Sequence, residues 1–387
     1  MKSFQSFRLS GPFKWIAAGV LAVSLAACSS GSDDPPSTTA TLSASLSGDQ
    51  EPTPTVTGAL GTGTLSLTSP SRELSGAISL NGMTATAAHV HLGDIGVNGA
   101  VIVPLAETAA GSGMWAVPPN TVVTEAQATA FAAGGLYFNA HSTENPGGEI
   151  RGQIGRQVFA AQMTAAQEVP TNTSTATGNG LVSLDPVTKK FTARMTLTGM
   201  TATAAHIHPG APGVNGPVLF PLSETAAGSG VWVSAADAVL TDAQITLLTT
   251  GGLYFNAHST AFPGGQIRGQ IGLNVRSASL NATQEVPPNA STATGTGTLV
   301  VNPATRAASG SIAITGMTAT AAHIHMGATG ANGPVIVPLT DVGAGVWNVP
   351  ANTVLSADQF KAYKQGNLYF NAHSTAFPGG EVRGQIR

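Results

Sequence analysis

One segment of this chain occurs three times, at a spacing of 117 residues. The sequence GMTATAAH stands at residues 82–89 and again at 199–206 and 316–323. Solenoid repeats are roughly 20–50 residues long, whereas a spacing near 117 matches an independent β-sandwich domain of about 100 residues. The chain is therefore predicted to fold as three tandem domains, each with its own core. They are numbered here as unit 1 (residues 41–155), unit 2 (156–272) and unit 3 (273–387).

Within each unit, short segments of alternating polarity predict β-strands. In unit 1 these segments include residues 75–80, 88–92 and 101–105, and the sequence GVNG between the last two is typical of a turn. The 47 glycines and the low charged fraction of 9% are typical of an exported all-β protein with many turns. We expect an all-β fold of three β-sandwich, immunoglobulin-like domains.

One short helix is expected in each unit. A hydroxyl residue followed three positions later by Gln fits a capping box, and each such helix is expected to end at a glycine about ten residues further on. The capping pairs are Thr124 and Gln127, Thr241 and Gln244, and Ser356 and Gln359, and the glycines are Gly134, Gly251 and Gly366.

A β-hairpin is predicted after each helix. In unit 1 the sequence LYFNAHS leads through a Pro-Gly-Gly turn into EIRGQI. Alternation places Tyr137, Asn139 and His141 on one face of the first strand. Glu149 and Arg151 of the second strand lie on that same face if the register allows.

The first 27 residues are predicted to be a targeting segment. Three basic residues precede an apolar run at 15–25 that is too short for an ordinary transmembrane helix. The sequence then reads Ala-Ala-Cys28, which resembles the lipobox of bacterial lipoproteins, and Cys28 is the only cysteine of the chain. We expect a signal peptide at 1–27, lipidation of Cys28, and a flexible linker at 28–40.

Export and lipidation set expectations for location and partners. Ser29 follows the cysteine, which in enterobacterial-type sorting favours the outer membrane. We therefore expect a cell-envelope protein anchored to a membrane through Cys28, with an extracellular protein or matrix component as a candidate partner. The formal net charge is −3, and residues 1–27 contribute three positive charges, which leaves about −6 for the remainder. An acidic chain of this kind argues against a nucleic-acid partner.

The repeat resembles the CHRD domain, a module first noted in chordin and also found in exported bacterial proteins. The resemblance is carried by a Q-E-V-P-P-like start, an A-x-H-I-H-x-G segment followed by G-x-N-G-P-V, and a closing Y-F-N-x-H-S/T before P-x-G-E-I-R-G-Q. These marks cover nearly all of residues 41–387 and recur three times. The resemblance implies an all-β, immunoglobulin-like module outside the cytoplasm, and it implies no particular activity.

Two units depart from this pattern. Unit 1 has Pro52 directly after Glu51, where units 2 and 3 have Val and then Pro, and unit 2 has Gln266 where the others have Glu149 and Glu381. If that glutamate were a required metal ligand, unit 2 should bind metal more weakly than the other two.

All nine histidines fall into three copies of one pattern, an H-x-H pair and a third His about fifty residues later. On a strand the pair projects from one face about 6.6 Å apart, which is close enough to chelate one ion. A third imidazole from a neighbouring strand completes a three-nitrogen set that suits zinc or copper. The sets are His89, His91 and His141; His206, His208 and His258; and His323, His325 and His373.

Two different roles for the histidines stay open. In one, they brace the fold through hydrogen bonds to Asn139, Glu149 or backbone carbonyls, and in the other they line a pocket for a different ligand. The residues expected beside the ligands are Asn139, Asn256, Asn371, Glu149, Glu381, Arg151, Arg268 and Arg383, and Trp115, Trp232 and Trp347 are expected in the cores.

The sequence offers no catalytic set. No thiol remains once Cys28 is lipidated, and no acid–base pair is evident outside the histidines. We predict a non-enzymatic, lipid-anchored binding protein with one candidate His₃ site for copper or zinc in each unit. The alternative is a structural or adhesive cell-envelope array in which the histidines only brace the fold, and a superoxide-dismutase-like copper enzyme is a third option.

Overall fold

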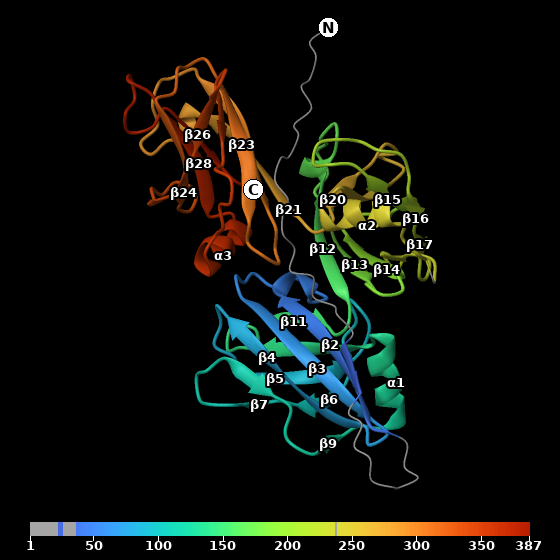
Figure 1. Ribbon diagram of the computed structural model, residues 1–387. Coiled ribbons are helices and arrows are strands. Elements are labelled where there is room, and N and C mark those ends of the chain that lie inside the picture. Colours follow the sequence, from blue (N-terminus) through green and yellow to red (C-terminus); the bar gives the residue numbers. More distant parts are fainter. Residues whose placement is uncertain (1–21, 26–35, 237) are drawn as a thin grey trace.

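The computed structural model describes residues 22–25, 36–236 and 238–387, which form three β-rich units (Figure 1). Cys28 lies outside the described residues, as does most of the expected signal peptide and linker. Units 2 and 3 lie above unit 1 in the view of Figure 1. In the described part of the chain, no helix is long and apolar enough to cross a membrane. The prediction of an all-β chain with three tandem domains is confirmed.

Unit 1 is preceded by β1 (Ala22–Leu25), which pairs with the first strand of the unit. Its own elements are β2 (Thr38–Ser47), η1 (Gly48–Gln50), β3 (Leu60–Ser69), β4 (Glu73–Asn81), β5 (Ala87–Leu92), β6 (Val101–Pro104), β7 (Ala106–Glu107), β8 (Met114–Ala116), β9 (Thr121–Val122), α1 (Glu125–Ala133), β10 (Leu136–His141) and β11 (Ile150–Gln153).

Unit 2 repeats this order of elements. They are β12 (Gln157–Thr164), η2 (Ala165–Gln167), β13 (Thr177–Leu184), β14 (Phe191–Thr198), β15 (Ala204–Pro209), β16 (Phe220–Pro221), β17 (Ser223–Glu224), β18 (Val231–Val233), α2 (Asp242–Thr249), β19 (Leu253–His258) and β20 (Ile267–Gln270).

Unit 3 repeats it again. Its elements are β21 (Asn274–Asn281), η3 (Ala282–Gln284), β22 (Thr294–Val301), β23 (Ala308–Thr315), β24 (Ala321–Met326), β25 (Val335–Pro338), β26 (Thr340–Gly343), β27 (Val346–Asn348), α3 (Ala357–Gln365), β28 (Leu368–His373) and β29 (Val382–Gln385).

The strands of each unit form one antiparallel sheet that folds around a core. In unit 1 the order is β6-β5-β10-β11-β2-β3-β4-β8-β7, and units 2 and 3 have the same order. Val90 and Phe138 from one end of this order belong to the same buried cluster as Leu65 and Ile78 from the other end. The sheet therefore curls until its two halves face each other. This continuity is a feature that the alternation of the sequence does not predict.

The three helix predictions are confirmed at their N-termini. The Thr124 hydroxyl accepts a hydrogen bond from the backbone N–H of Gln127, and the Gln127 side-chain oxygen accepts one from the backbone N–H of Thr124. The same capping box opens α2 and α3. Helices α1 and α3 end at Gly134 and Gly366, whose φ angles of 71° and 73° are left-handed. Helix α2 is instead capped by Thr250, with Gly251 one residue later.

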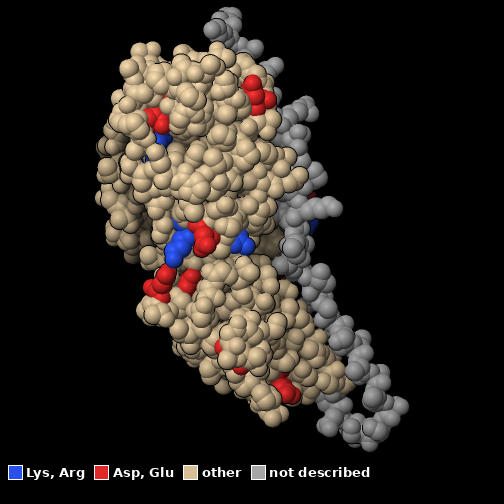
Figure 2. Space-filling view, turned by 90° about the vertical axis from the view of Figure 1, so that its left-hand side faces the viewer, with Lys and Arg blue, Asp and Glu red and all other residues tan. Residues whose placement is uncertain are grey.

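Each unit has its own buried apolar cluster, as predicted for independent domains. The three tryptophans are 8–9% exposed and belong to these clusters, which confirms their core placement. The units are also joined. Lys364 of α3 in unit 3 lies 2.9 Å from Asp49 of unit 1, with both side chains buried. Figure 2 shows charged side chains gathered where the upper and lower parts of the molecule meet, on a face that is otherwise mostly uncharged.

Candidate metal centre

The histidines of each unit lie on two neighbouring strands. In unit 1, β5 carries His89 and His91 and pairs with β10, which carries His141. The register sets His89 opposite Asn139 and His91 opposite Tyr137, so these five side chains share one face of the sheet. The residues between them point into the core. The H-x-H pair and the third His therefore meet on the side of the sheet away from the core.

The imidazole nitrogens of each set converge. His89 Nδ1 lies 3.1 Å from His141 Nε2, and the equivalent distance is 3.2 Å in units 2 and 3. In every set, one nitrogen from each of the three rings lies within 4.8 Å of the others. Two nitrogens bound tetrahedrally to one zinc ion are about 3.3 Å apart, given bonds of about 2.0–2.1 Å. The closest pair in each unit is thus near the spacing of two ligands of one ion.

The second histidine of each H-x-H pair has one nitrogen engaged and one without a partner. His91 Nδ1 lies 3.0 Å from the carbonyl oxygen of Gly99, and it donates there because a carbonyl can only accept. Its Nε2 then carries a lone pair, and this atom is buried and has no hydrogen-bond partner in the part of the chain that the structure describes. His208 and His325 repeat both features, with Gly216 and Gly333 as the acceptors.

The third histidine is oriented in the same way. His141 Nδ1 lies 3.0 Å from the carbonyl oxygen of Pro146 in the Pro-Gly-Gly turn, so Nε2 keeps its lone pair. His89 Nδ1 faces this nitrogen. If His89 carries its proton on Nδ1, it donates to His141 Nε2. If His89 carries its proton on its own Nε2, its Nδ1 joins His141 Nε2 as a second ligand. Carbonyl contacts of this kind fix the tautomer of metal-binding histidines. The equivalent acceptors in units 2 and 3 are Pro263 and Pro378.

Burial lowers the pKa of most of these imidazoles and so favours the neutral form, which is the form that binds metal. Burial is the largest cause of the lowered pKa of His89 and His91, which fall below the ordinary value of 6.5, and the neighbouring His141 lowers both further. The same cause lowers the pKa of His206, His208, His258, His323 and His325.

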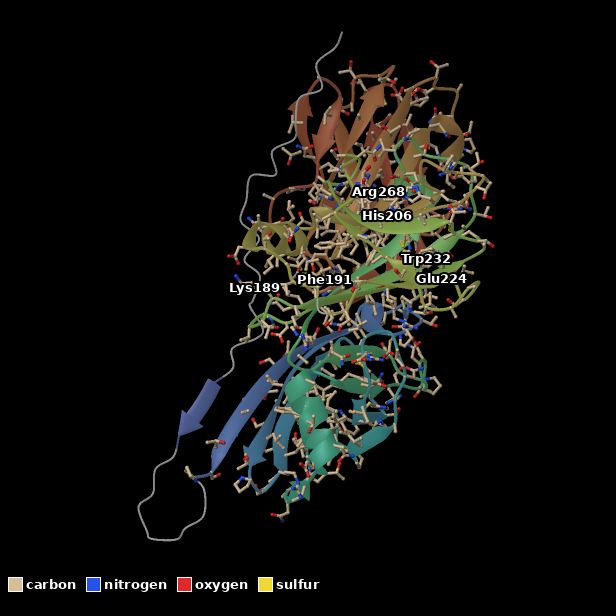
Figure 3. All side chains as sticks on the ribbon, turned by 90° about the vertical axis from the view of Figure 1, so that its right-hand side faces the viewer. Lys189, Phe191, His206, Glu224, Trp232 and Arg268 are labelled. Carbon is tan, nitrogen blue, oxygen red and sulfur yellow. The ribbon has the colours of Figure 1, made fainter. Side chains whose placement is uncertain are left out.

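A stack of three side chains supports the buried histidine. The ring of Tyr137 lies against His91, with centroids 4.8 Å apart and an interplanar angle of 13°, and the guanidinium of Arg151 lies 3.4 Å from the Tyr137 ring centroid. The Tyr137 hydroxyl accepts a hydrogen bond from the backbone N–H of Gly99, whose carbonyl binds His91. The loop and the imidazole are therefore fixed together. In unit 2, Figure 3 labels His206 and Arg268, which lie on either side of Asn256 in the sheet register.

The register brings Arg151 and Asn139 opposite each other on β11 and β10, so the face that the sequence predicted for the hairpin is the observed one. Arg151 is buried and donates to the carbonyl oxygens of Val97 and Asp94. The corresponding arginines and asparagines are Arg268, Arg383, Asn256 and Asn371.

The glutamates expected beside the ligands contact other groups. Glu149 accepts a hydrogen bond from the Thr57 hydroxyl, and Glu381 accepts one from the Ser291 hydroxyl. In unit 2, Gln266 donates to the Ser174 hydroxyl at the same place. The histidine sets contain only imidazoles. The exchange of Glu for Gln in unit 2 therefore alters a hydroxyl contact, and the described structure gives no reason for weaker metal binding there.

A buried glutamate near the site has no role in the sequence-based prediction. Glu51 accepts a hydrogen bond from Asn139 at 3.0 Å, and burial raises its pKa to about 7 although Arg151 and Asn139 favour its charged form. Glu168 and Glu285 are bound in the same way by Asn256 and Asn371, with pKa values raised by burial to about 7 and about 6. The signal was present, because a Gln-Glu pair follows the first strand in all three units.

The comparison with protein families decides what kind of repeat this is. The family model of the CHRD domain matches residues 42–154, 159–271 and 276–386. The chain belongs to the CHRD family. A search of curated proteins found no match. The CHRD match covers each histidine set, the stacked tyrosine and arginine, and the buried glutamate of every unit.

Proposed function

We propose that each CHRD unit binds one transition-metal ion through its three histidines, and that the protein is a non-enzymatic metal-binding protein of the cell envelope. The observation that carries the proposal is the buried Nε2 of His91, His208 and His325, which has no hydrogen-bond partner among the described residues. In each unit, one nitrogen of this imidazole lies within 4.8 Å of nitrogens from the other two rings.

A purely structural role for these histidines does not explain why their Nε2 atoms are buried without a partner in the described residues. Leaving a buried polar group unsatisfied costs about 1–3 kcal/mol, and here the cost recurs in three copies of one fold. The carbonyl contact of Nδ1 orients the ring, and orientation is what a metal ligand needs from its surroundings. A metal ion would satisfy the lone pair, which accounts for both nitrogens at once.

The ligand set favours zinc or copper. Three imidazoles suit both ions, and neither requires a fourth ligand from the protein. The imidazole sets of the described residues leave such a position to solvent or to an outside ligand. We assign no reaction to this position, because the groups that cluster there in the described residues are imidazoles alone.

The remaining parts of the proposal rest on the sequence. Lipidation at Cys28 would anchor the protein to a membrane, with the outer membrane favoured by Ser29, and residues 28–40 would hold the units away from the lipid surface. An extracellular protein or matrix component is the proposed partner class, and the acidic balance disfavours nucleic acid.

Metal stoichiometry tests the proposal. Purified protein loaded with zinc or with copper and then dialysed should retain three ions per chain. His91→Ala, His208→Ala and His325→Ala should each reduce this number by one, and the triple variant should retain none. Gln266→Glu is the matched control, because it gives unit 2 the residue of the other units and should leave three ions bound.

Two results would overturn the proposal in favour of the structural alternative. One is wild-type protein that retains no metal. The other is a triple variant that keeps all its metal. If the histidines only brace the fold, the three substitutions should lower the melting temperature equally with and without metal.

A further inference from the structure

Two units of the protein contain the same cleft in different states. The cleft lies between the Gln-Glu segment after the first strand and the loop after the H-x-H strand. In unit 1 its own residues are Asp49, Glu51, Pro52 and Gly96. In unit 3 the residues at the equivalent positions are Thr283, Glu285, Val286 and Gly330.

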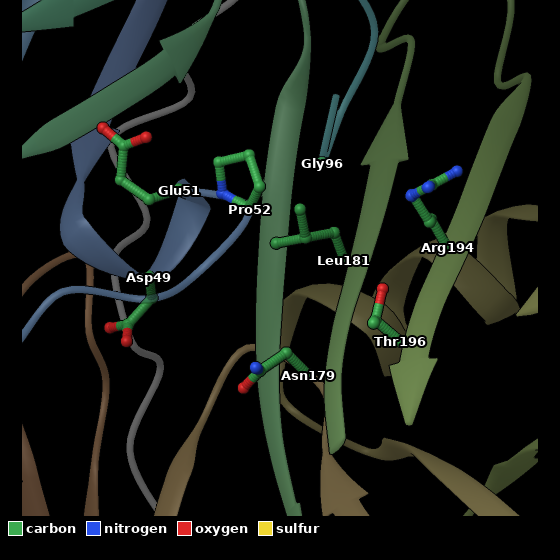
Figure 4. Close-up of a pocket in the computed structure, with 8 residues that line it drawn as sticks. All are labelled: Asp49, Glu51, Pro52, Gly96, Asn179, Leu181, Arg194 and Thr196. Atoms are coloured by element: carbon green, nitrogen blue, oxygen red, sulfur yellow. The ribbon is translucent and has the colours of Figure 1, made fainter. Parts of the chain in front are cut away.

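In unit 1 this cleft is closed by unit 2. Leu181 on β13 and Arg194 on β14 lie against it, together with Asn179 and Thr196 (Figure 4). Only about 20 Å³ of space remains. A Cβ atom on Gly96 would lie 2.9 Å from Arg194 Cδ, which shows how closely the two units approach. Leu181 also packs with Ile95 of the unit 1 loop in a small buried cluster.

In unit 3 the cleft is open. Its volume is about 350 Å³, and among the described residues no atom lies within 4 Å of a Cβ built on Gly330. Thr329 stands at the position of Ile95 and is exposed, whereas Ile95 is buried. The two clefts therefore differ because a neighbouring unit fills the cleft of unit 1 and leaves the cleft of unit 3 open.

The occupant of the unit 1 cleft is a specific feature of unit 2. Leu181 and Arg194 are direct cross-strand partners, so they stand side by side on one hairpin face. The equivalent pairs are Thr64 and Ala77 in unit 1 and Thr298 and Ser311 in unit 3. No other unit carries the Leu–Arg pair, and the pair of unit 2 is already used within the chain.

We infer that the open cleft of unit 3 is a docking site for a β-hairpin of a partner protein that presents an aliphatic side chain beside an arginine. Val286 and Pro288 supply apolar surface for the aliphatic group, and the arginine is assigned from Arg194, which lines the equivalent cleft of unit 1. Arg383 also lines the cleft, but its guanidinium is held by backbone carbonyls and stacks on Tyr369. Glu285 also lines the cleft, and its carboxylate accepts a hydrogen bond from Asn371. At the edge of the cleft, the exposed Arg387 donates to the Thr329 hydroxyl.

A synthetic hairpin tests this inference. Residues 177–198, closed by a disulfide between cysteines at the paired positions 177 and 198, present Leu181 and Arg194 as in unit 2. Titrated into the full-length protein in a calorimeter, this hairpin should bind. A control hairpin with Leu181→Thr and Arg194→Ala carries the residues of unit 1 and should bind at least tenfold more weakly.

Host variants locate the binding site. Thr329→Trp fills the cleft with an indole and should reduce the number of bound hairpins by one. Thr340→Trp, at an exposed position on β26, is the matched control and should change nothing. Both variants should melt at the wild-type temperature. The assay is run in a chelator, so its result is independent of the proposed metal sites.

Three results would overturn the inference: no hairpin binding, equal binding of the control hairpin, or unchanged binding to Thr329→Trp. Sedimentation of the protein alone addresses a second copy as the occupant. Dimers that disappear in Thr329→Trp would assign the cleft to self-association and would also overturn the inference.

Discussion

The three units have the same contacts on the face that carries the histidines, but they have different residues on the outer face of the helix. The His–His contact is 3.1–3.2 Å and the Arg–Tyr contact 3.4–3.5 Å in every unit. By contrast, the helix position that is Lys364 in unit 3 is Ala132 in unit 1 and Thr249 in unit 2. The histidine face is thus repeated, whereas the contacts that join the units each occur once.

Helix α3 shows the consequence of that difference. It buries Phe360, Ala362, Tyr363 and Lys364, whereas α1 buries only Phe131 and α2 only Leu248. Part of the additional burial comes from unit 1, because Lys364 also donates to the carbonyl oxygen of Thr55 at 2.6 Å. The outer face of α3 has become an interface between domains, whereas Ala132 at the equivalent position of α1 is exposed and Thr249 of α2 donates within its own helix.

The largest expected effect comes from breaking that interface. Lys364→Ala leaves Asp49 buried without its cation, and loss of one partner of a buried pair costs about 3–5 kcal/mol. Urea unfolding should show this loss. Thr249→Ala, the equivalent change in unit 2, should cost less than about 1 kcal/mol. The double exchange Asp49→Lys with Lys364→Asp should recover part of the loss, and equal effects of the two alanine variants would contradict the comparison.

The next effect concerns the buried glutamate shared by the units. Because burial raises the pKa of Glu51 from 4.5 to about 7, the folded state binds the extra proton between these pH values. The Glu51 carboxylate charge, which burial makes unfavourable in the folded state, is absent below about pH 4.5. Its destabilising effect on the folded state grows as the pH rises and is fully present above pH 7. Glu51→Gln should therefore stabilise the protein at pH 8, by on the order of 3 kcal/mol relative to its effect at pH 4.5.

The three glutamates give an internal scale for this prediction. Glu168→Gln should behave like Glu51→Gln, while Glu285→Gln should show a smaller change, because the pKa of Glu285 is raised only to about 6. Unfolding free energies measured at both pH values check the order. A difference between variant and wild type that does not change with pH would contradict the role assigned to burial.

A smaller effect is expected at the stack beside the metal site. Tyr137→Phe keeps the ring against His91 but removes the hydroxyl that holds Gly99. Contacts outside the ligand set typically change metal affinity 10–100-fold, and we expect about tenfold weaker zinc binding in unit 1 alone. Tyr254→Phe and Tyr369→Phe should do the same in their own units. Competition titration with a chelator measures the change, and three unaltered affinities would show that the hydroxyl has no part in positioning the histidine.

The smallest effect belongs to an exposed contact at the same interface. Lys361 lies 2.7 Å from Glu144, but their side chains are 35% and 71% exposed. Such pairs contribute about 0–1 kcal/mol. Lys361→Ala should therefore change the unfolding free energy far less than Lys364→Ala. A loss of the same size would mean that burial does not distinguish the two pairs.

The site was more predictable than the contacts between units, for a physical reason. Alternation along a strand is local, so the sequences around His89 and His141 predict which side chains share a face, and the register confirms it. The Lys364–Asp49 contact joins residues 315 positions apart and depends on how folded units are placed. The sequence also did not predict the role of Glu51, because the Glu51 side chain reaches Asn139 only once η1 has formed.

X-ray absorption of the zinc-loaded protein tests the central claim most directly, because it reports the atoms bound to the ion. We expect three imidazole nitrogens per zinc at about 2.0–2.1 Å, with a light atom in the remaining position. The signal per ion should be unchanged when His325→Ala removes one of the three sites, since the other two sites are independent. A coordination shell with one or two imidazoles, or one altered for all ions by that single substitution, would contradict three separate His₃ sites.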